Sequence, residues 1–194
     1  SIAGGISEMS GLGPEVRKRT DALDSLGNTT AATGKGFAIG SAAFAALSMM
    51  SSYMYTWTDH KKDIVLNLLD PLILAGALIG AALPFLFSGM LIEAVANAAR
   101  QMVDEVRRQF REIKGLLQGE MLSDYKTCIA ISTEGALKEM RVPALMSILF
   151  PVISGFLFEP LFVGGILIGA TISTVMLAVF TGNAGGAWNN AKKY

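Results

Sequence analysis

Apolar positions cluster into four stretches along the chain. They run over residues 35–57, about 68–92, about 142–158 and 161–180. At 1.5 Å of rise per residue, a helix of roughly 20 residues crosses a hydrocarbon layer of roughly 30 Å. Tyr53, Tyr55 and Trp57 mark the membrane interface at the end of the first stretch. The pattern predicts an all-α membrane protein with about four transmembrane helices and cytosolic helical extensions.

Small residues recur at four-residue spacing inside three of these stretches. The pairs are Gly36 and Gly40, Gly76 and Gly80, and Gly165 and Gly169. Such spacing lets helix backbones approach closely, so it predicts tight packing in a compact bundle or inside a larger membrane assembly. Pro84 removes a backbone hydrogen bond within the second stretch and should kink it. Only Glu159 and Pro160 separate the last two stretches, which predicts a tight antiparallel hairpin.

The segment between the second and third stretches is amphipathic. Over residues 93–117, three- and four-residue spacing places on one face Val95, Ala99, Met102, Val106, Phe110 and Ile113, and on another Asp104, Arg107, Arg108 and Arg111. We expect the second helix to continue into the cytosol and to end near Gly115 and Gly119, and Ser123 or Asp124 to cap a further helix. The charges favour a solvated face with pairing along the helix over a direct role in chemistry.

Basic residues predict the orientation of the chain. If the first membrane helix leaves the cytosol at Lys35, all Lys and Arg residues lie on the cytosolic side except Lys61 and Lys62. Both termini should then share the compartment of Arg107, with His60 on the opposite side. Residues 1–33 become a cytosolic or interfacial helical segment. Residues 34–194 become the membrane bundle, with its cytosolic helical extension at residues 93–141.

Composition narrows the class of protein. With 52% hydrophobic and 16% charged residues, the chain should lie partly in a membrane and partly in the cytosol. Its 16 basic residues equal its 16 acidic ones, which argues against a nucleic-acid-binding protein. The single cysteine, Cys128, and single histidine exclude an intrachain disulfide and a zinc cluster. The start at Ser1, without a basic and then apolar leader, suggests a processed end or a cut through a longer sequence.

Two polar stretches at the membrane edge are candidates for chemistry. Residues 185–194, GGAWNNAKKY, close the last apolar helix with amides and lysines, which suits an anion site or a snorkelling anchor. Residues 27–36, GNTTAATGKG, lack the spacing of a Walker A motif. They offer the Asn28 amide, threonine hydroxyls and Lys35, a set that suits cations held with an anion. The alternative is a helix start rich in Thr and Gly, with Lys35 snorkelling.

Both stretches resemble signatures of the membrane-integral inorganic pyrophosphatases, the cation pumps driven by pyrophosphate. The terminal stretch is similar to Gly-Gly-Ala-Trp-Asp-Asn-Ala-Lys-Lys. Residues 21–24, 27–30 and 35–42 resemble the signature that follows the family's Asp-Asn-Ala-Gly-Gly-Ile motif, and residues 3–6 and 105–113 continue the likeness. The resemblance covers nearly the whole chain, in the family's order.

This resemblance implies part of the C-terminal half of a pump that works as a homodimer. It implies a funnel at the cytosolic helix ends that holds magnesium pyrophosphate. By the same likeness, Lys192 and Lys193 would bind pyrophosphate and Asn28 would lie in the cation shell. Ala31 and Gly34 match the potassium-dependent subclass, so Mg²⁺ and K⁺ are the implied cofactors.

Two positions depart from the family. Asn189 and Ser1 stand at metal-binding positions where the family has aspartate, and neutral groups meet the charge of magnesium less well. The family's other acidic motifs have no counterpart in the 194 residues, so we expect this chain alone not to be catalytic. Two functions stay open. The chain is a fragment or subunit of the pump, completed by other helices or chains, or it is a degenerate non-catalytic subunit with a structural role in a larger membrane complex.

Overall fold

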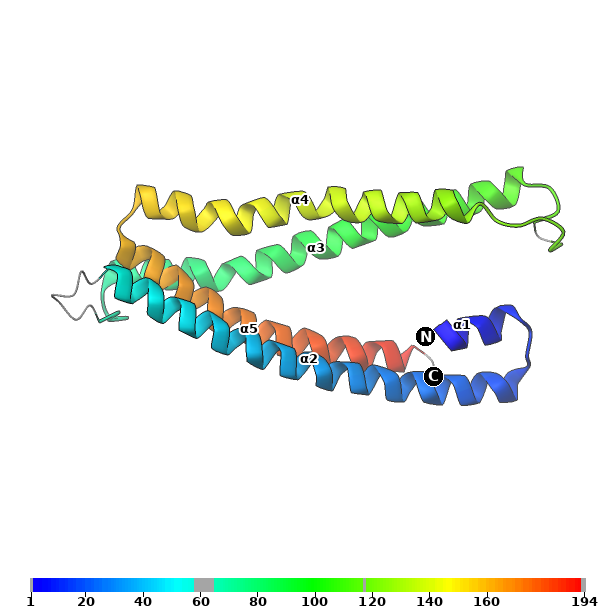
Figure 1. The fold of residues 1–194 in the computed structure, drawn as a ribbon, viewed down its shortest axis with the longest axis horizontal. Coiled ribbons are helices and arrows are strands. Elements are labelled where there is room, and N and C mark those ends of the chain that lie inside the picture. Colours follow the sequence, from blue (N-terminus) through cyan, green and yellow to red (C-terminus); the bar gives the residue numbers. More distant parts are fainter. Residues whose placement is uncertain (1, 58–64, 117, 193–194) are drawn as a thin grey trace.

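The computed structural model describes residues 2–57, 65–116 and 118–192, and the regular structure of this part is entirely helical (Figure 1). Its helices are α1 (Ile2–Met9), α2 (Pro14–Trp57), α3 (Pro71–Glu112), α4 (Tyr125–Leu157) and α5 (Pro160–Ala191). The four helices α2 to α5 are long and apolar enough to cross a membrane. The predicted all-α fold with four membrane helices is confirmed. His60, Lys61 and Lys62 lie outside the described residues.

Side-chain caps set where two of the helices begin. Asp70 accepts hydrogen bonds from the backbone N–H groups of Leu72, at 2.8 Å, and Ile73, at 3.3 Å. Because this cap is followed by Pro71, α3 begins there rather than near residue 68. Asp124 caps α4 in the same way, as the sequence predicted, by accepting from the backbone N–H of Thr127 at 3.1 Å.

The long helices extend well past the apolar stretches. At 42 residues, α3 is about 63 Å long, about twice the thickness of a hydrocarbon layer. Its second half is the predicted extension, which ends at Glu112. Gly115 and Gly119, at φ 88° and 74°, form the loop that follows. Helix α2 runs from Pro14 through residues 33 and 34 without a break, so the predicted division at residue 33 is not marked by a helix end.

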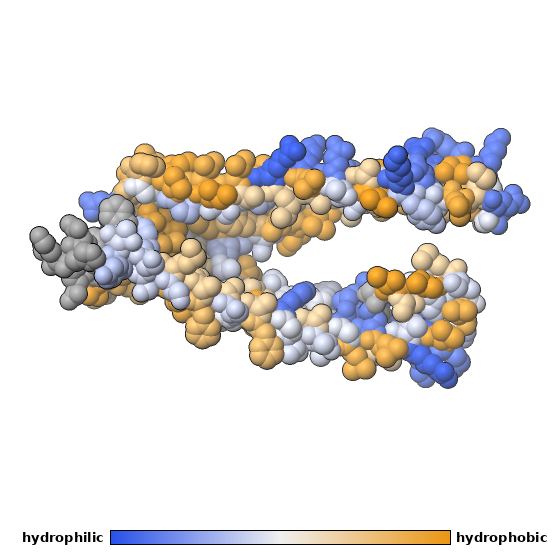
Figure 2. All heavy atoms as spheres, viewed as in Figure 1, coloured by the Kyte–Doolittle hydropathy of each residue, from blue (hydrophilic) through white to orange (hydrophobic). Residues whose placement is uncertain are grey.

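Successive long helices run in opposite directions, so the N-terminus, the end of α5 and the loop between α3 and α4 lie at one end of the molecule (Figure 1). Hydrophilic residues gather at this end, which we call the polar end, and hydrophobic residues cover the other half (Figure 2). This is the arrangement that the predicted orientation requires.

Helices α3 and α5 cross in direct backbone contact. A Cβ atom at Gly76, Gly80, Gly165 or Gly169 would overlap a backbone carbonyl oxygen of the opposite helix. Next to this seam, the Ser173 hydroxyl donates to the Ala81 carbonyl at 2.7 Å. The prediction of close packing is therefore confirmed for two of the three glycine pairs.

The third glycine pair makes no close contact within the described chain, so its packing inside a larger membrane assembly stays a prediction. A Cβ at Gly36 or Gly40 would meet no described atom within 4 Å, because α5 contacts a different face of α2. Likewise, the apolar face of the α3 extension is largely exposed, with Val95 at 68%. Towards α4, the helix presents Ala94, Ala98 and Met102 together with the buried Glu105 and Gln109.

The hairpin between α4 and α5 is tight only at its turn. The rings of Phe158 and Phe162 lie 4.5 Å apart between centroids, and the Tyr53 hydroxyl of α2 donates to the Pro160 carbonyl at 3.1 Å. Beyond the turn, α4 follows α3 while α5 follows α2 (Figure 1). The expectation of a closely paired hairpin is correct at the connection and wrong along its arms.

Candidate functional site: a charged cleft between α1, α2 and α5

A cleft of about 490 Å³ opens at the polar end, where α1, the start of α2 and the end of α5 meet. Its lining consists of Gly4, Gly5, Arg17, Asp21, Asp24, Asn189 and Lys192. The lining thus combines two cationic side chains, two carboxylates and an amide with the glycine backbone of α1. Such a mixed lining suits a ligand that carries both a metal ion and an anion.

Helical periodicity brings three of the charges together. Arg17, Asp21 and Asp24 are spaced at i, i+4 and i+7, which places them on one face of α2. The Arg17 Nε atom donates to Asp21 Oδ1 at 2.9 Å and to Oδ2 at 3.1 Å. Both side chains keep contact with solvent, at 40% and 29% exposure. The ion pair therefore fixes a guanidinium beside the cleft without burying it.

Helix α5 supplies the opposite wall. Lys192 follows the last helical turn and is exposed, and its backbone N–H donates to the Trp188 carbonyl at 3.2 Å. Asn189 lies half-buried one turn earlier. The structure therefore brings together two of the residues that the resemblance assigned to substrate and metal. Lys193 and Ser1 lie outside the described residues.

Asn28 joins the two walls away from the cleft. Its Nδ2 atom donates to Asn190 Oδ1 at 2.9 Å, and Asn190 Nδ2 reaches the Ser25 carbonyl at 3.5 Å. The two helices lie in van der Waals contact beside this bond, since a Cβ at Gly186 would lie 3.6 Å from the Cβ of Ala32. The structure therefore places Asn28 at the contact of α2 with α5, not in the cleft lining, and its role in a cation shell stays a prediction.

The remaining members of the Thr- and Gly-rich stretch do not join the cleft. Ala31 and Gly34 are exposed on α2. The hydroxyls of Thr29, Thr30 and Thr33 donate to backbone carbonyls one turn earlier in the same helix, at 3.0–3.1 Å. The stretch lies inside α2 and not at a helix start, because the helix already begins at Pro14.

Three lining residues were missed as site candidates from the sequence. The sequence counted Arg17 only among the basic residues on the cytosolic side, and it placed Asp21 and Asp24 in a stretch that resembles a family signature, without a role as ligands. Their i, i+4, i+7 spacing just before the Asn28 motif is the signal that could have found them. The sequence could not show that these residues face α1 and α5, because this depends on the tertiary structure.

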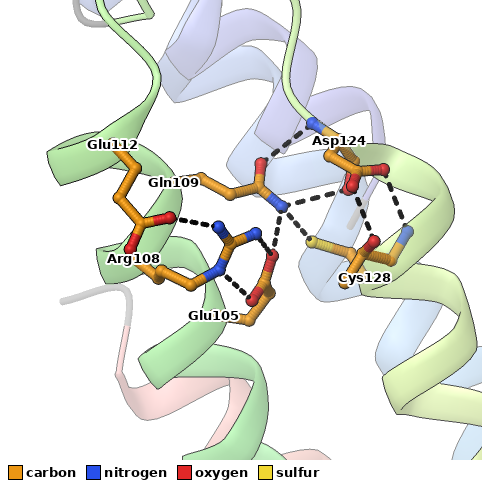
Figure 3. Close-up of polar contacts among 7 residues, drawn as sticks. Glu105, Arg108, Gln109, Glu112, Asp124 and Cys128 are labelled. Atoms are coloured by element: carbon orange, nitrogen blue, oxygen red, sulfur yellow. Dashed lines mark hydrogen bonds and ion pairs between the residues drawn. The ribbon is translucent and has the colours of Figure 1, made fainter.

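A second polar cluster joins α3 to α4 at the same end (Figure 3). Gln109 is only 2% exposed. Its Nε2 atom donates to Glu105 Oε1 at 2.8 Å and to the Asp124 carbonyl at 3.1 Å, and its Oε1 accepts from the Asp124 N–H at 2.9 Å. Arg108 donates to Glu105, at 2.7 and 2.9 Å, and to Glu112, at 2.5 Å. The predicted pairing of charged side chains along the helix is therefore confirmed.

Hydrogen bonding shifts the acidity of this cluster. The Arg108 guanidinium, and then the Gln109 amide, lower the pKa of Glu105 from 4.5 to about 2. The hydroxyl and the backbone N–H of Thr127 lower the pKa of Asp124. Both carboxylates are therefore ionised and engaged at neutral pH, and the cluster is a closed structural joint.

The cleft has the donor set of a site that shares its metal with a substrate. Among the described residues, no three His, Cys, Asp or Glu side chains gather as a metal cage. Mg²⁺ usually takes one or two carboxylates together with substrate phosphates and water. Asp21 and Asp24 meet that need, while Arg17 and Lys192 suit the phosphate oxygens.

Comparison with known proteins identifies the family. The chain matches the Inorganic H+ pyrophosphatase family over residues 2–194. It belongs to this family. It is 58% identical to the K(+)-stimulated pyrophosphate-energized sodium pump of Thermotoga maritima, 50% to a putative pump of that kind from Bacteroides thetaiotaomicron, and 45% to the K(+)-insensitive pyrophosphate-energized proton pump of Methanosarcina mazei.

These matches cover 98–99% of this chain but only 27–30% of each relative, so the chain spans less than a third of the length of the family members that it matches. The described residues contain four helices of membrane length, and this member of the family is a multi-pass integral membrane protein.

Proposed function

We propose that this chain supplies part of the magnesium pyrophosphate site of a pyrophosphate-driven cation pump, at the cytosolic ends of its helices. The observation that carries the proposal is the cleft that is lined by Arg17, Asp21 and Asp24 of α2 and by Lys192 at the end of α5. Membership of the family supports the reaction class, and the geometry of the cleft supports the location. Other helices, from the rest of a longer chain or from further subunits, complete the site and the oligomer.

Each wall has a distinct part in this proposal. Lys192, with Lys193 after it, binds phosphate oxygens as a flexible point charge on α5. Asp21, Asp24 and the Asn189 amide offer oxygens to magnesium, which when bound would neutralise charge that develops on the phosphoryl group. The bond between Asn28 and Asn190 keeps the two walls at a fixed separation.

Potassium stimulation is the second part of the proposal. Ala31 and Gly34 match the potassium-dependent subclass, and the relatives at 58% and 50% identity are named as K(+)-stimulated, whereas one at 45% is named as K(+)-insensitive. We therefore expect K⁺ to raise the activity of the assembly. Replacing Ala31 by Lys together with Gly34 by Thr should remove that response, which assays with and without K⁺ would measure.

One observation favours the structural alternative. Asn189 puts a neutral amide in the cleft, and Asp21 is already paired with Arg17, so the lining offers magnesium less charge than a cage of carboxylates would. In that case the chain is a non-catalytic subunit whose helices still pack, and the cleft binds no magnesium pyrophosphate.

Titration of magnesium imidodiphosphate, a non-hydrolysable analogue, separates the two functions. In the complete membrane assembly that contains this chain, Lys192→Ala should raise the Kd at least about tenfold, because a charge-assisted contact is lost. Lys126→Ala, at an exposed position on α4, is the matched control. No binding by the wild type would support the structural alternative. The 194-residue chain by itself should release no phosphate from pyrophosphate.

A further inference from the structure

We infer that Arg17 is a phosphate-binding residue of the cleft and that Asp21 is the residue that positions it. The inference rests on the proposed function and adds a third cation to the two terminal lysines. It starts from one contact, in which both carboxylate oxygens of Asp21 accept from the same inner nitrogen, Nε, of Arg17.

The geometry of a guanidinium makes that contact informative. Arginine has a rigid, planar head with five N–H donors, and its outer edge matches two phosphate oxygens at once. A carboxylate bound at Nε fixes the plane of the head. Asp21 therefore orients the outer fork of Arg17, which lines the same cleft as Lys192. A lysine at this position would carry the charge but not the fork.

Exposure makes the ion pair exchangeable. The side chains of Arg17 and Asp21 are 40% and 29% exposed, so solvent screens the ion pair in part and lowers its contribution to stability. A phosphate group brings more negative charge than one carboxylate, so the guanidinium is expected to turn part of its hydrogen bonding towards the ligand. The Asp21 oxygens released by that change become available to the metal that accompanies the phosphate. Arrival of the anion and exposure of a metal ligand are thereby coupled in one pair of residues.

The neighbouring basic residues do not share this position. Lys18 and Arg19 are exposed, and neither lines the cleft. Arg19 is thus a matched control on the same helix, two residues from Arg17. The alternative is a purely structural role, in which the ion pair only stabilises the first turns of α2. This alternative predicts that the loss of Arg17 changes the stability of the protein and not its affinity for the ligand.

The test uses the complete membrane assembly and four variants, Arg17→Lys, Arg17→Ala, Asp21→Asn and Arg19→Lys. We measure the Kd of magnesium imidodiphosphate, the KM and kcat for magnesium pyrophosphate, and the Tm. Arg17→Lys should raise the Kd about tenfold and Arg17→Ala more, because the fork and then the charge are lost. Asp21→Asn should raise both the Kd and the magnesium concentration needed for half-maximal binding. Arg19→Lys should stay within about twofold of the wild type.

The outcomes separate this inference from the proposed function. If the wild type binds the analogue and Lys192→Ala weakens binding, but Arg17→Lys and Arg17→Ala bind like the wild type, only the inference is overturned. A fall in Tm with an unchanged Kd in the Arg17 variants also overturns it, in favour of the structural role. If the wild type binds no analogue, the proposed function fails and the inference fails with it.

Discussion

Two polar clusters lie at the same end of the molecule, and they differ in what completes them. In the cluster between α3 and α4, Gln109 is 2% exposed and bonds to Glu105 and to both backbone groups of Asp124 (Figure 3). In the cluster between α2 and α5, the charges surround about 490 Å³ of open space, and Lys192 is exposed. The polar groups of the first cluster find their hydrogen-bond partners within the protein. The charges of the second cluster line a cleft that a ligand can enter.

This difference shows why charge density alone does not mark a binding site. The motif around Arg107 and Arg108 is the densest run of charge in the chain, yet it pairs along its own helix and clamps the start of α4. A buried polar group needs its partners inside the protein. The cleft side chains differ from this joint because they keep contact with solvent, with Arg17 at 40% exposure and Lys192 exposed.

Both clusters depend on one scaffold, the glycine seam between α3 and α5, so breaking the seam should have the largest effect. Gly169→Ala places a Cβ onto the Ala77 carbonyl oxygen, which forces the two backbones apart. We expect a loss of about 3 kcal/mol or more, measured as a fall in Tm of the assembly in detergent. Gly89→Ala is the matched control, because no described atom lies within 4 Å of its Cβ. Alanine has a higher helix propensity than glycine, so Gly89→Ala should not lower the Tm. Equal losses of Tm in the two variants would contradict a specific role of the close contact between α3 and α5.

The next effect separates the two clusters from each other. Gln109→Leu removes the side chain that joins Glu105 to Asp124, so the part-buried backbone N–H of Asp124 loses this acceptor and Glu105 loses one donor. We expect it to cost about 2–3 kcal/mol of stability while the KM for pyrophosphate stays within about twofold. Gln101→Leu, at an exposed position on the same helix, is the control. A large rise in KM for Gln109→Leu at unchanged Tm would show that the α3–α4 cluster belongs to the site.

Local sequence patterns predicted the elements well, because they depend on neighbours along the chain. The four spans, the continuation of α3 past Ile92 and the Asp124 cap follow from hydropathy and capping alone. Local patterns do not decide which helices pack against each other. Gly36 and Gly40 have the same spacing as Gly165 and Gly169, but only the latter meet another backbone in the described chain.

The site was half predicted, for the same reason. The terminal amides and Lys192 stood out because they interrupt an apolar helix, whereas Arg17 and Asp21 lie in a polar segment where nothing local distinguishes a solvated face from a cleft wall. The Gln109 joint was missed because apolar periodicity marks Val106 and Phe110 as the packing face, and the structure buries the polar side instead.

Acid should weaken the α3–α4 cluster in a defined window. The pKa of Glu105 is lowered to about 2 in the folded state from an ordinary 4.5, so its ionised form stabilises the fold above pH 4.5. That contribution is lost as the pH falls from 4.5 towards 2, and the lowered pKa of Asp124 adds a loss in the same direction. The Tm difference between the wild type and Glu105→Gln should be largest above pH 4.5 and shrink towards pH 2. A difference that grows on acidification would contradict this assignment.

The smallest change is a single charge in the cleft. Asn189→Asp restores the carboxylate that the family places there and puts a third acidic group beside Lys192. If the cleft holds magnesium pyrophosphate, a charged oxygen replaces a neutral one on the metal, and the Kd measured by calorimetric titration should fall about tenfold. Asn183→Asp, exposed two turns earlier on α5, controls for added charge alone. If the chain is instead a structural relative, the new carboxylate gains no metal and only carries a desolvation cost at the membrane edge. If magnesium pyrophosphate binds, or binds more tightly, in Asn189→Asp and not in Asn183→Asp, the structural alternative is rejected. If neither the wild type nor either variant binds it, the proposed role in a pyrophosphate site is rejected.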